Sequence, residues 1–291
     1  YRTADMNVGR NSAKGILLNN GKVLVTGGIY LQLNWESRSS AELFDPSTNT
    51  WSITGSMNTA RRGHFMTVLQ DGKVLIGGGY NTSGGPLSSV EIYDPATGVF
   101  TNVASMPQAR SNVYAGLLSN GNVLVMGGYN PSGGRLLTAT IYNPSTNTWS
   151  TVNSTMHYGH ADGAVMVKLN DGRFMIAGGI DYGGVANAKT DIFDPSTNTF
   201  SAGPELNSQR GYFTAHTLQS GKVVFLGGYD GLGHVWDTVE VFDPTTNQII
   251  TQARGMLHPR YGHSSALMQD GRVMIVGTNS SNGIYGEVFN E

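Results

Sequence analysis

The chain has 291 residues, with 18 basic and 20 acidic side chains and a formal net charge of -2 at pH 7. This near neutrality provides no field to hold a polyanion, so nucleic acid is excluded as an expected partner. No apolar run approaches the ~20 residues that span a bilayer, so we expect no membrane insertion. The absence of cysteine excludes disulfides, thiolate metal sites and cysteine catalysis.

Charged residues make up only 13% of the chain, while glycine contributes 40 residues. The surface therefore relies on Ser, Thr, Asn and Gly, which favours an extracellular or cell-surface protein. The sequence starts at Tyr1 without a signal-like segment, and we expect a water-soluble part of a longer chain.

A short pattern recurs about every fifty residues along the chain, which is the signature of a repeat architecture. Each copy has two apolar runs around a turn dipeptide that allows positive φ: Asn20-Gly21, Asp71-Gly72, Asn120-Gly121, Asp171-Gly172, Ser220-Gly221 and Asp270-Gly271. We expect each dipeptide to close a hairpin of strands a and b. A glycine pair follows, at Gly27-Gly28, Gly77-Gly78, Gly127-Gly128, Gly178-Gly179, Gly227-Gly228 and, in degenerate form, Gly277-Thr278.

Further along each copy, an Asp-Pro or Asn-Pro turn, as in "AELFDPSTNTW", predicts two more strands, c and d. Strand b is a continuous apolar run, as in Val123-Leu124-Val125-Met126, which indicates burial on both faces. Strand c alternates, as in Val90-Glu91-Ile92-Tyr93. Six four-stranded antiparallel sheets that cannot bury their faces alone predict an all-β, six-bladed β-propeller, as a single domain over residues 1–291.

These features resemble the kelch family, whose blades carry a double glycine after strand b and a Tyr-Asp-Pro and Trp segment later. The resemblance covers essentially the whole chain and implies a six-bladed kelch propeller of the galactose-oxidase-like kind. The chain ends inside strand c of the sixth copy, and "YRTADM" at its start aligns with "VASM" at 103–106. We therefore expect the N-terminal residues, Tyr1 to Ala4, to supply the outer strand of the last blade and to close the ring.

Loops a–b and c–d leave one face of such a fold, and loops b–c and d–a leave the other. The first set is short and nearly repeated, whereas the second set varies, so we predict recognition on the b–c/d–a face. The ligand-binding loops would be 29–40, 79–89, 180–189 and 229–238.

A basic residue precedes strand a in every copy: Arg10, Arg61, Arg110, His160, Arg210 and Arg260. Strand c carries an acid in every copy except one: Glu42, Glu91, Asp191, Glu240 and Glu287, with Thr140 in the third. His160 follows Thr140 across a blade junction, so we predict inter-blade ion pairs Glu42 to Arg61, Glu91 to Arg110, Asp191 to Arg210, Glu240 to Arg260 and Glu287 to Arg10. The alternative is a ring of arginines that binds an anion.

Two tryptophans, Trp35 and Trp236, have no counterpart in the repeat and fall in b–c loops. Exposed aromatics beside polar groups form platforms for sugars or protein hot spots, and the alternative is that each packs its own loop. The candidate ligand-binding residues of the face are Asn34, Trp35, Arg38, His157, Tyr158, His160, Tyr182, His234, Trp236, Asp237, Tyr261 and His263.

The histidines in "HYGH" and "HPRYGH", together with His64 and His234, belong to the same face. Converging imidazoles could bind a transition metal or act in acid-base catalysis. The alternative is that each is a hydrogen-bonded polar group of its blade, and we expect no metal and no cofactor.

Galactose oxidase, which is similar to a kelch propeller, needs a cysteine-crosslinked tyrosine that this chain cannot form. No carboxylate pair, Ser/His/Asp spacing, phosphate loop or calcium loop is recognisable. We therefore predict a non-catalytic binding module, of protein-interaction or lectin-like type, with a protein or glycan ligand. The alternatives are a carbohydrate-active enzyme at the channel mouth and a structural spacer of a larger surface protein.

Overall fold

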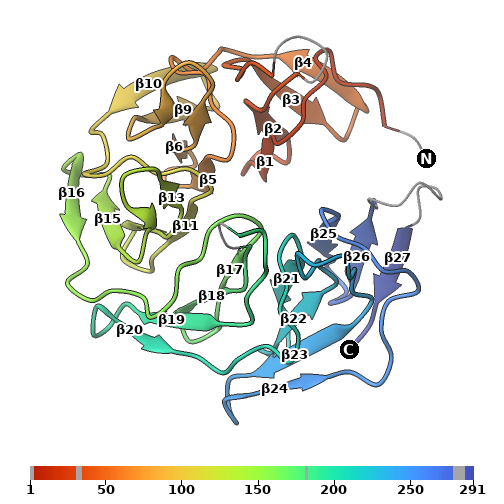
Figure 1. Ribbon diagram of the computed structural model, residues 1–291. Helices are drawn as coiled ribbons and strands as arrows, with labels where there is room; N and C mark the ends of the chain where they lie inside the picture. Colours follow the sequence, from red (N-terminus) through yellow and green to blue (C-terminus); the bar gives the residue numbers. More distant parts are fainter. Residues whose placement is uncertain (1–2, 31–34, 181–182, 278–285) are drawn as a thin grey trace. The chain divides into compact units, whose positions relative to one another are not determined.

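The computed structural model describes residues 3–30, 35–180, 183–277 and 286–291 (Figure 1). The chain forms two compact units, unit 1 (Tyr1–Thr151) and unit 2 (Val152–Glu291). Each unit holds three successive antiparallel blade sheets, with strands in the order a, b, c, d in the first five blades and a, b, c among the described residues of the sixth. These six sheets confirm the predicted all-β class of a six-bladed propeller, while the extent of a single domain over 1–291 stays a prediction.

Unit 1 contains blades 1 to 3, coloured red to green in Figure 1. Blade 1 comprises β1 (Lys14–Leu17), β2 (Val23–Thr26), β3 (Ala41–Asp45) and β4 (Thr50–Ile53). Blade 2 comprises β5 (Phe65–Val68), β6 (Val74–Gly77), β9 (Val90–Asp94) and β10 (Val99–Val103). Blade 3 comprises β11 (Tyr114–Leu117), β12 (Val123–Met126), β15 (Ala139–Asn143) and β16 (Thr148–Thr151). The b–c loops of blades 2 and 3 add small hairpins, β7 (Tyr80–Asn81) with β8 (Gly85–Pro86) and β13 (Tyr129–Asn130) with β14 (Gly134–Arg135).

Unit 2 contains blades 4 to 6, coloured green to blue in Figure 1. Blade 4 comprises β17 (Val165–Lys168), β18 (Phe174–Ala177), β19 (Thr190–Asp194) and β20 (Thr199–Ala202). Blade 5 comprises β21 (Thr214–Thr217), β22 (Val223–Leu226), β23 (Val239–Asp243) and β24 (Gln248–Thr251). Blade 6 comprises, within the described residues, β25 (Ser264–Leu267), β26 (Val273–Val276) and β27 (Gly286–Phe289).

The turn residues form the connections that the repeat predicts. In blade 2 the Gly72 N–H donates to Leu69 O and the Leu69 N–H donates to Lys73 O, which closes a three-residue a–b loop with Gly72 at φ 82°. At the c–d turn, Asp45 accepts the Ser47 N–H at 3.0 Å, and Asn49 takes a left-handed φ of 55°. Gly, Asp and Asn favour these positions because they tolerate positive φ or bond to nearby backbone.

The apolar core lies between neighbouring blades of the same unit. The b strands β6, β12, β18 and β22 are buried along their whole length, as predicted. Clusters join blade 1 to blade 2, blade 2 to blade 3, blade 4 to blade 5 and blade 5 to blade 6. Within each unit the middle sheet thus buries apolar side chains against the sheets on both sides, which explains why a single repeat has no core of its own.

Two consecutive glycines after strand b allow a neighbouring blade to approach closely. Gly27 has φ 64°, and a Cβ there would lie 2.3 Å from the carbonyl oxygen of Arg61 in the next blade. The equivalent pair in blade 2 is Gly78-Gly79, with φ 62° and 92°, and not Gly77-Gly78 as the sequence alignment suggested. The physical reason for this correction is that Gly77 is the last residue of strand β6, where φ is not left-handed.

The start of the chain packs on blade 1 as the segment after β10 packs on blade 3. The Ala4 N–H donates to Asn49 Oδ1 at 3.2 Å, and Ala4 O accepts from Trp51 Nε1 at 3.0 Å. Ala104 repeats both contacts with Asn147 and Trp149, at 2.8 and 2.7 Å. The predicted alignment of the two segments is therefore confirmed. Tyr1 and Arg2 lie outside the described residues, so closure by an N-terminal strand stays a prediction.

The described part of the chain contains no helix of the length and apolarity that crossing a bilayer requires.

Candidate ligand-binding face

Buried ion pairs hold the d–a loops that lead to the b–c/d–a face. The guanidinium before strand a contacts the carboxylate of strand c in the same blade, at 3.0 Å for Arg10 and Glu42 and 2.7 Å for Arg61 and Glu91. Equivalent pairs are Arg210 with Glu240 at 2.5 Å and Arg260 with Glu287 at 2.6 Å. The predicted inter-blade partners are therefore wrong: the ion pairs of Glu42, Glu91, Glu240 and Glu287 lie within their own blades.

The carboxylate of each pair also fixes the backbone of the loop. Glu91 accepts the N–H groups of Asn58 and Thr59, at 2.6 and 3.0 Å, and both Glu91 and Arg61 are fully buried. Glu42 accepts the equivalent bonds from Asn7 and Val8. Burial alone would raise the pKa of Glu42, but the hydrogen bonds from Asn7 and the charge of Arg10 lower the pKa below its usual value. The acid is therefore a structural anchor of the d–a loop.

Blades 3 and 4 depart from this pattern, and their departures explain the error in the predicted partners. In blade 4 His160 replaces the arginine: its Nδ1 lies 2.8 Å from Gly178 O, and its Nε2 lies 3.2 Å from Asp191. His157 also contacts Asp191, at 2.9 Å. The carboxylate of Asp191 is therefore paired within blade 4, and the predicted partner, Arg210, pairs with Glu240 instead. Burial raises the pKa of Asp191, whereas hydrogen bonds from His160 and His157 lower it more, to a value below the usual one. Blade 3 keeps Arg110 but has Thr140 in place of the acid.

Two of the predicted histidines join the inner strands of neighbouring blades. His64 Nε2 lies 2.8 Å from Thr26 Oγ1, and His263 Nε2 lies 2.9 Å from Thr214 Oγ1. Burial lowers the pKa of His64 well below its usual value, and burial and the Arg260 charge lower the pKa of His263 to about 4. Both imidazoles therefore act as hydrogen-bonded polar groups of the blade, which is the alternative that the sequence left open.

We expect stability to fall in acid through His263. The folded-state pKa of about 4 lies below the ordinary 6.5, so the unfolded state binds the proton first as pH falls from 6.5 to 4. Between pH 7 and 4.5 this side chain should cost roughly 2 kcal/mol of unfolding free energy. Urea titrations of wild type and His263→Gln at both pH values check this, and equal losses in the two proteins would contradict it.

On unit 1 the face carries paired arginines and tyrosines. The Arg38 guanidinium lies 4.9 Å from the Tyr30 ring centroid, and Arg62 lies 5.0 Å from the Tyr80 centroid. A pocket of about 380 Å³ beside the first pair is lined by Tyr30, Glu36, Ser37, Arg38, Ser39, Ser40 and Ala60. Trp35 next to it is 59% exposed and has a left-handed φ of 56°. Asn34 lies outside the described residues.

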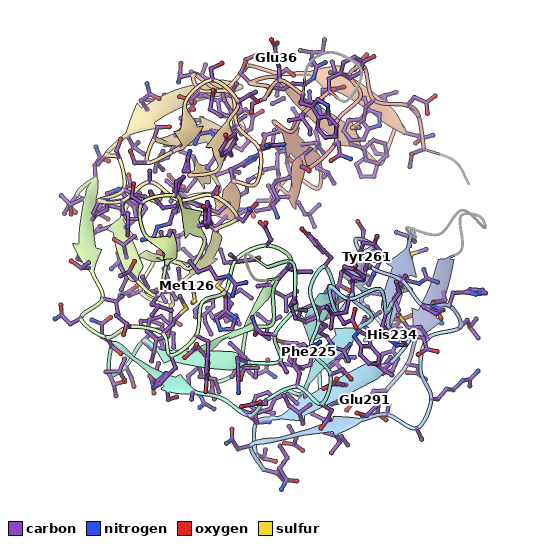
Figure 2. All side chains as sticks on the ribbon, viewed as in Figure 1. Glu36, Met126, Phe225, His234, Tyr261 and Glu291 are labelled. Atoms are coloured by element: carbon purple, nitrogen blue, oxygen red, sulfur yellow. The ribbon has the colours of Figure 1, made fainter. Side chains whose placement is uncertain are left out.

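On unit 2 the face carries three tyrosines in contact. The Tyr229 and Tyr261 rings stack at 5.0 Å between centroids, and Tyr212 lies 6.4 Å from Tyr261. Tyr261 and His234 are labelled in Figure 2, on loops of neighbouring blades. Burial raises the pKa of Tyr212, and the Asp162 charge and Tyr261 raise it further.

Trp236 and Tyr158, two further predicted residues of unit 2, make contacts with other segments of that unit. Trp236 donates its Nε1–H to Gln209 O at 3.0 Å and meets His234 edge to face at 4.1 Å, so Trp236 secures its loop. Tyr158 lies under the Lys189 ammonium at 5.2 Å. The side chain of Asp237 is exposed, and Tyr182 lies outside the described residues.

Sequence reasoning missed Tyr212, although the repeat contains the signal. The second residue after the strand-a arginine has positive φ in Ser12, Gly63, Asn112, Tyr212 and Gly262, and Gly163 serves the same place in blade 4. Gly and Asn are common at such positions, and a bulky tyrosine is not. This backbone links neighbouring blades, since the Tyr212 N–H donates to Gly163 O at 2.8 Å and Tyr212 O accepts from Gly262 at 2.7 Å.

Within the residues that the structure describes, no group of three or more His, Asp or Glu side chains is arranged to hold a metal ion. The His157, His160 and Asp191 contacts are those of a blade anchor.

The glycine pairs, the Asp-Pro turns and the six meander sheets define a kelch-type propeller, a class of domain that is commonly a protein-interaction module. Residues 12–205 match the KLHDC2/KLHL20/DRC7 Kelch-repeats domain, and the chain therefore belongs to the kelch-repeat family.

Shorter matches occur among curated proteins. The chain is similar to Kelch-like protein 15 of Danio rerio, with 37% identity over 67 residues, which cover 22% of this chain and 11% of that protein. It is also similar to Kelch-like protein 15 of Mus musculus and of Homo sapiens, each with 40% identity over 63 residues, or 20% of this chain and 10% of the relative. The matched stretch thus spans about a tenth of these relatives.

Proposed function

We propose that this kelch domain is a protein-interaction module whose b–c/d–a face binds a partner protein through an aromatic patch on unit 2. The patch consists of Tyr212, Tyr229 and Tyr261. The observation that carries the proposal is Tyr212, which is 41% exposed and held at φ 54°. A left-handed tyrosine costs about 1–2 kcal/mol relative to glycine, and 41% of its surface nevertheless stays exposed.

Strained conformations of this kind persist where the surroundings impose them, and they concentrate at binding sites. Tyr212 is held by hydrogen bonds on both sides, and Tyr261 limits the freedom of its ring. Rigid, partly exposed tyrosines offer a partner a large contact area at a low cost in conformational entropy. These features support a preformed protein-binding hot spot.

The test is a peptide-display selection on the purified domain, followed by calorimetric affinities of the selected peptides. We expect Tyr212→Gly to weaken binding at least tenfold, since exposed aromatic anchors dominate such interfaces. The same variant should keep or raise the melting temperature, because glycine accepts positive φ. A merely structural tyrosine would show the opposite: lower stability and unchanged affinity.

The matched control is Ile250→Ala, which removes a 56% exposed apolar side chain from strand β24 of the same unit. This variant should bind all selected peptides as the wild type does. Peptides that bind wild type and Tyr212→Gly equally would contradict the proposed patch.

A glycan ligand is a second candidate, supported by Trp35 beside the pocket on unit 1. A 59% exposed indole next to serine hydroxyls, Glu36 and Arg38 offers both a stacking surface and polar groups for a sugar. A glycan array with wild type and Trp35→Ala tests this candidate, and signals that persist in the variant would reject it. An extracellular or cell-surface location, suggested by the low charge content, stays part of this proposal.

A further inference from the structure

Blade 3 buries an arginine without the acid that accompanies its counterparts. Arg110 is 2% exposed, and Thr140 stands where the other blades of unit 1 have Glu42 and Glu91. Within the described residues, no carboxylate lies within ion-pair distance of Arg110, whereas Arg10 and Arg61 each have one. The charge of this guanidinium is thus unbalanced locally.

The neighbouring blade shows what is missing. Arg61 donates from one terminal nitrogen to Gly78 O and Ser89 O, and from the other to Ser89 Oγ and Glu91. Arg110 repeats the first three contacts, to Gly127 O at 3.0 Å, Thr138 O at 2.9 Å and Thr138 Oγ1 at 3.1 Å. The fourth partner, the carboxylate, is the only member of this set without an equivalent.

The backbone donors to the carboxylate have changed together with the acid. In blade 2 they are the N–H groups of Asn58 and Thr59, and the equivalent residues in blade 3 are Pro107 and Gln108. Proline has no N–H, so one donor is lost, while Gln108 keeps the other. Thr140 cannot replace the acid, because its hydroxyl donates to Ser150 O at 2.9 Å.

We propose that blade 3 binds a small monovalent anion of the halide class at Arg110, in the place that the strand-c carboxylate takes in the other blades. The guanidinium supplies the charge, and the Gln108 N–H supplies a second donor. Threonine has only two fewer non-hydrogen atoms than glutamate, so the space suits a chloride ion better than a phosphate or a sulfate.

The protonation state of Arg110 agrees with this assignment. Burial lowers the pKa of Arg110 to about 10, with no acidic neighbour to raise it. The guanidinium therefore still carries its charge at neutral pH, and a buried charge without a counter-ion is costly. An anion that binds only the folded state would stabilise it by mass action.

The first test compares the melting temperature of the wild-type protein in sodium chloride, sodium bromide and sodium gluconate at equal ionic strength. We expect the two halides to raise it by about 2–4 °C over gluconate, with saturation. Crystals grown with bromide should show an anomalous peak beside Arg110. Equal melting temperatures in the three salts would overturn the proposal, and a bromide peak without a thermal effect would mark an adventitious ion only.

The matched variant restores the carboxylate and its donor with Pro107→Asn and Thr140→Glu. This variant should lose both the halide effect and the bromide peak, because the new carboxylate takes the place of the anion. A halide effect of unchanged size in the variant would place the anion elsewhere. If the variant does not fold, the bromide peak of the wild-type crystal decides the position alone, and its absence at Arg110 overturns the proposal.

Discussion

Replacement of Glu91 by glutamine is expected to destabilise the protein by about 3–5 kcal/mol. Glu91 and Arg61 are both fully buried and lie 2.7 Å apart, so the variant leaves a guanidinium in the interior without its counter-charge. The same change weakens the acceptor for the Asn58 and Thr59 N–H groups, which position the d–a loop of blade 2. Urea denaturation of wild type and Glu91→Gln measures the loss.

Two controls separate the buried charge from a general effect of substitution. Arg61→Met combined with Glu91→Leu removes both charges, and we expect it to be more stable than Glu91→Gln alone. Asp270→Asn removes a partner of Arg272 in a pair that lies at the surface, and this change should be undetectable. A double variant less stable than the single one would show that packing, and not charge, explains the effect.

The blade framework could be predicted because its signals are local. Asp71-Gly72 closes a hairpin through its own φ and hydrogen bonds, and Val123 to Met126 show burial through composition alone. The same local pattern recurs in six copies, so a strand or turn that is ambiguous in one copy can be assigned from the equivalent residues of the others. The register of the glycine pair in blade 2 was the exception, since three consecutive glycines, Gly77 to Gly79, leave the sequence ambiguous.

The partners of the ion pairs could not be predicted, because sequence spacing does not distinguish the two choices. Glu42 lies between Arg10 and Arg61 in the chain, and either arginine satisfies the repeat equally well. The decisive facts are spatial: the carboxylate bonds to the Asn7 and Val8 N–H groups, which stand beside Arg10. The coincidence of Thr140 in place of an acid and His160 in place of an arginine was misleading, because His160 contacts Asp191 of its own blade. The change that accompanies Thr140 within blade 3 is Pro107, which lacks the N–H that the acid would accept.

The ligand-binding face itself stays a prediction, and the structure shows only how its predicted residues lie. Trp35 is exposed and Tyr261 is partly exposed, whereas the Trp236 indole donates to Gln209 O through a hydrogen bond that the sequence does not predict. Tyr212 departs from the Ser, Gly and Asn that stand at its position in other copies, but the reason why this departure matters, a positive φ, is known only from the structure.

Substitution of Gly27 by alanine should cost at least about 3 kcal/mol of unfolding free energy. Gly27 has φ 64°, and the added Cβ would lie 2.3 Å from Arg61 O, a backbone atom that cannot rotate away. Arg61 O also accepts the Gly28 N–H at 3.0 Å, so its displacement breaks a bond between blades 1 and 2. Urea denaturation measures the effect.

The matched control for Gly27 is Gly21→Ala, because Gly21 has φ 81° and a Cβ there meets no atom within 4 Å. This variant carries the left-handed penalty without the clash, and it should lose only about 1–2 kcal/mol. A larger loss at Gly27 would show that the glycine pair serves close contact between blades. The same residue, Arg61, supplies both the contacted carbonyl and the buried guanidinium. The glycine pair and the ion pair therefore stabilise the same contact between blades 1 and 2. Equal losses of unfolding free energy in the two variants would mean that the positive φ alone explains the glycine at position 27, and that blade 2 can shift to accommodate a Cβ there.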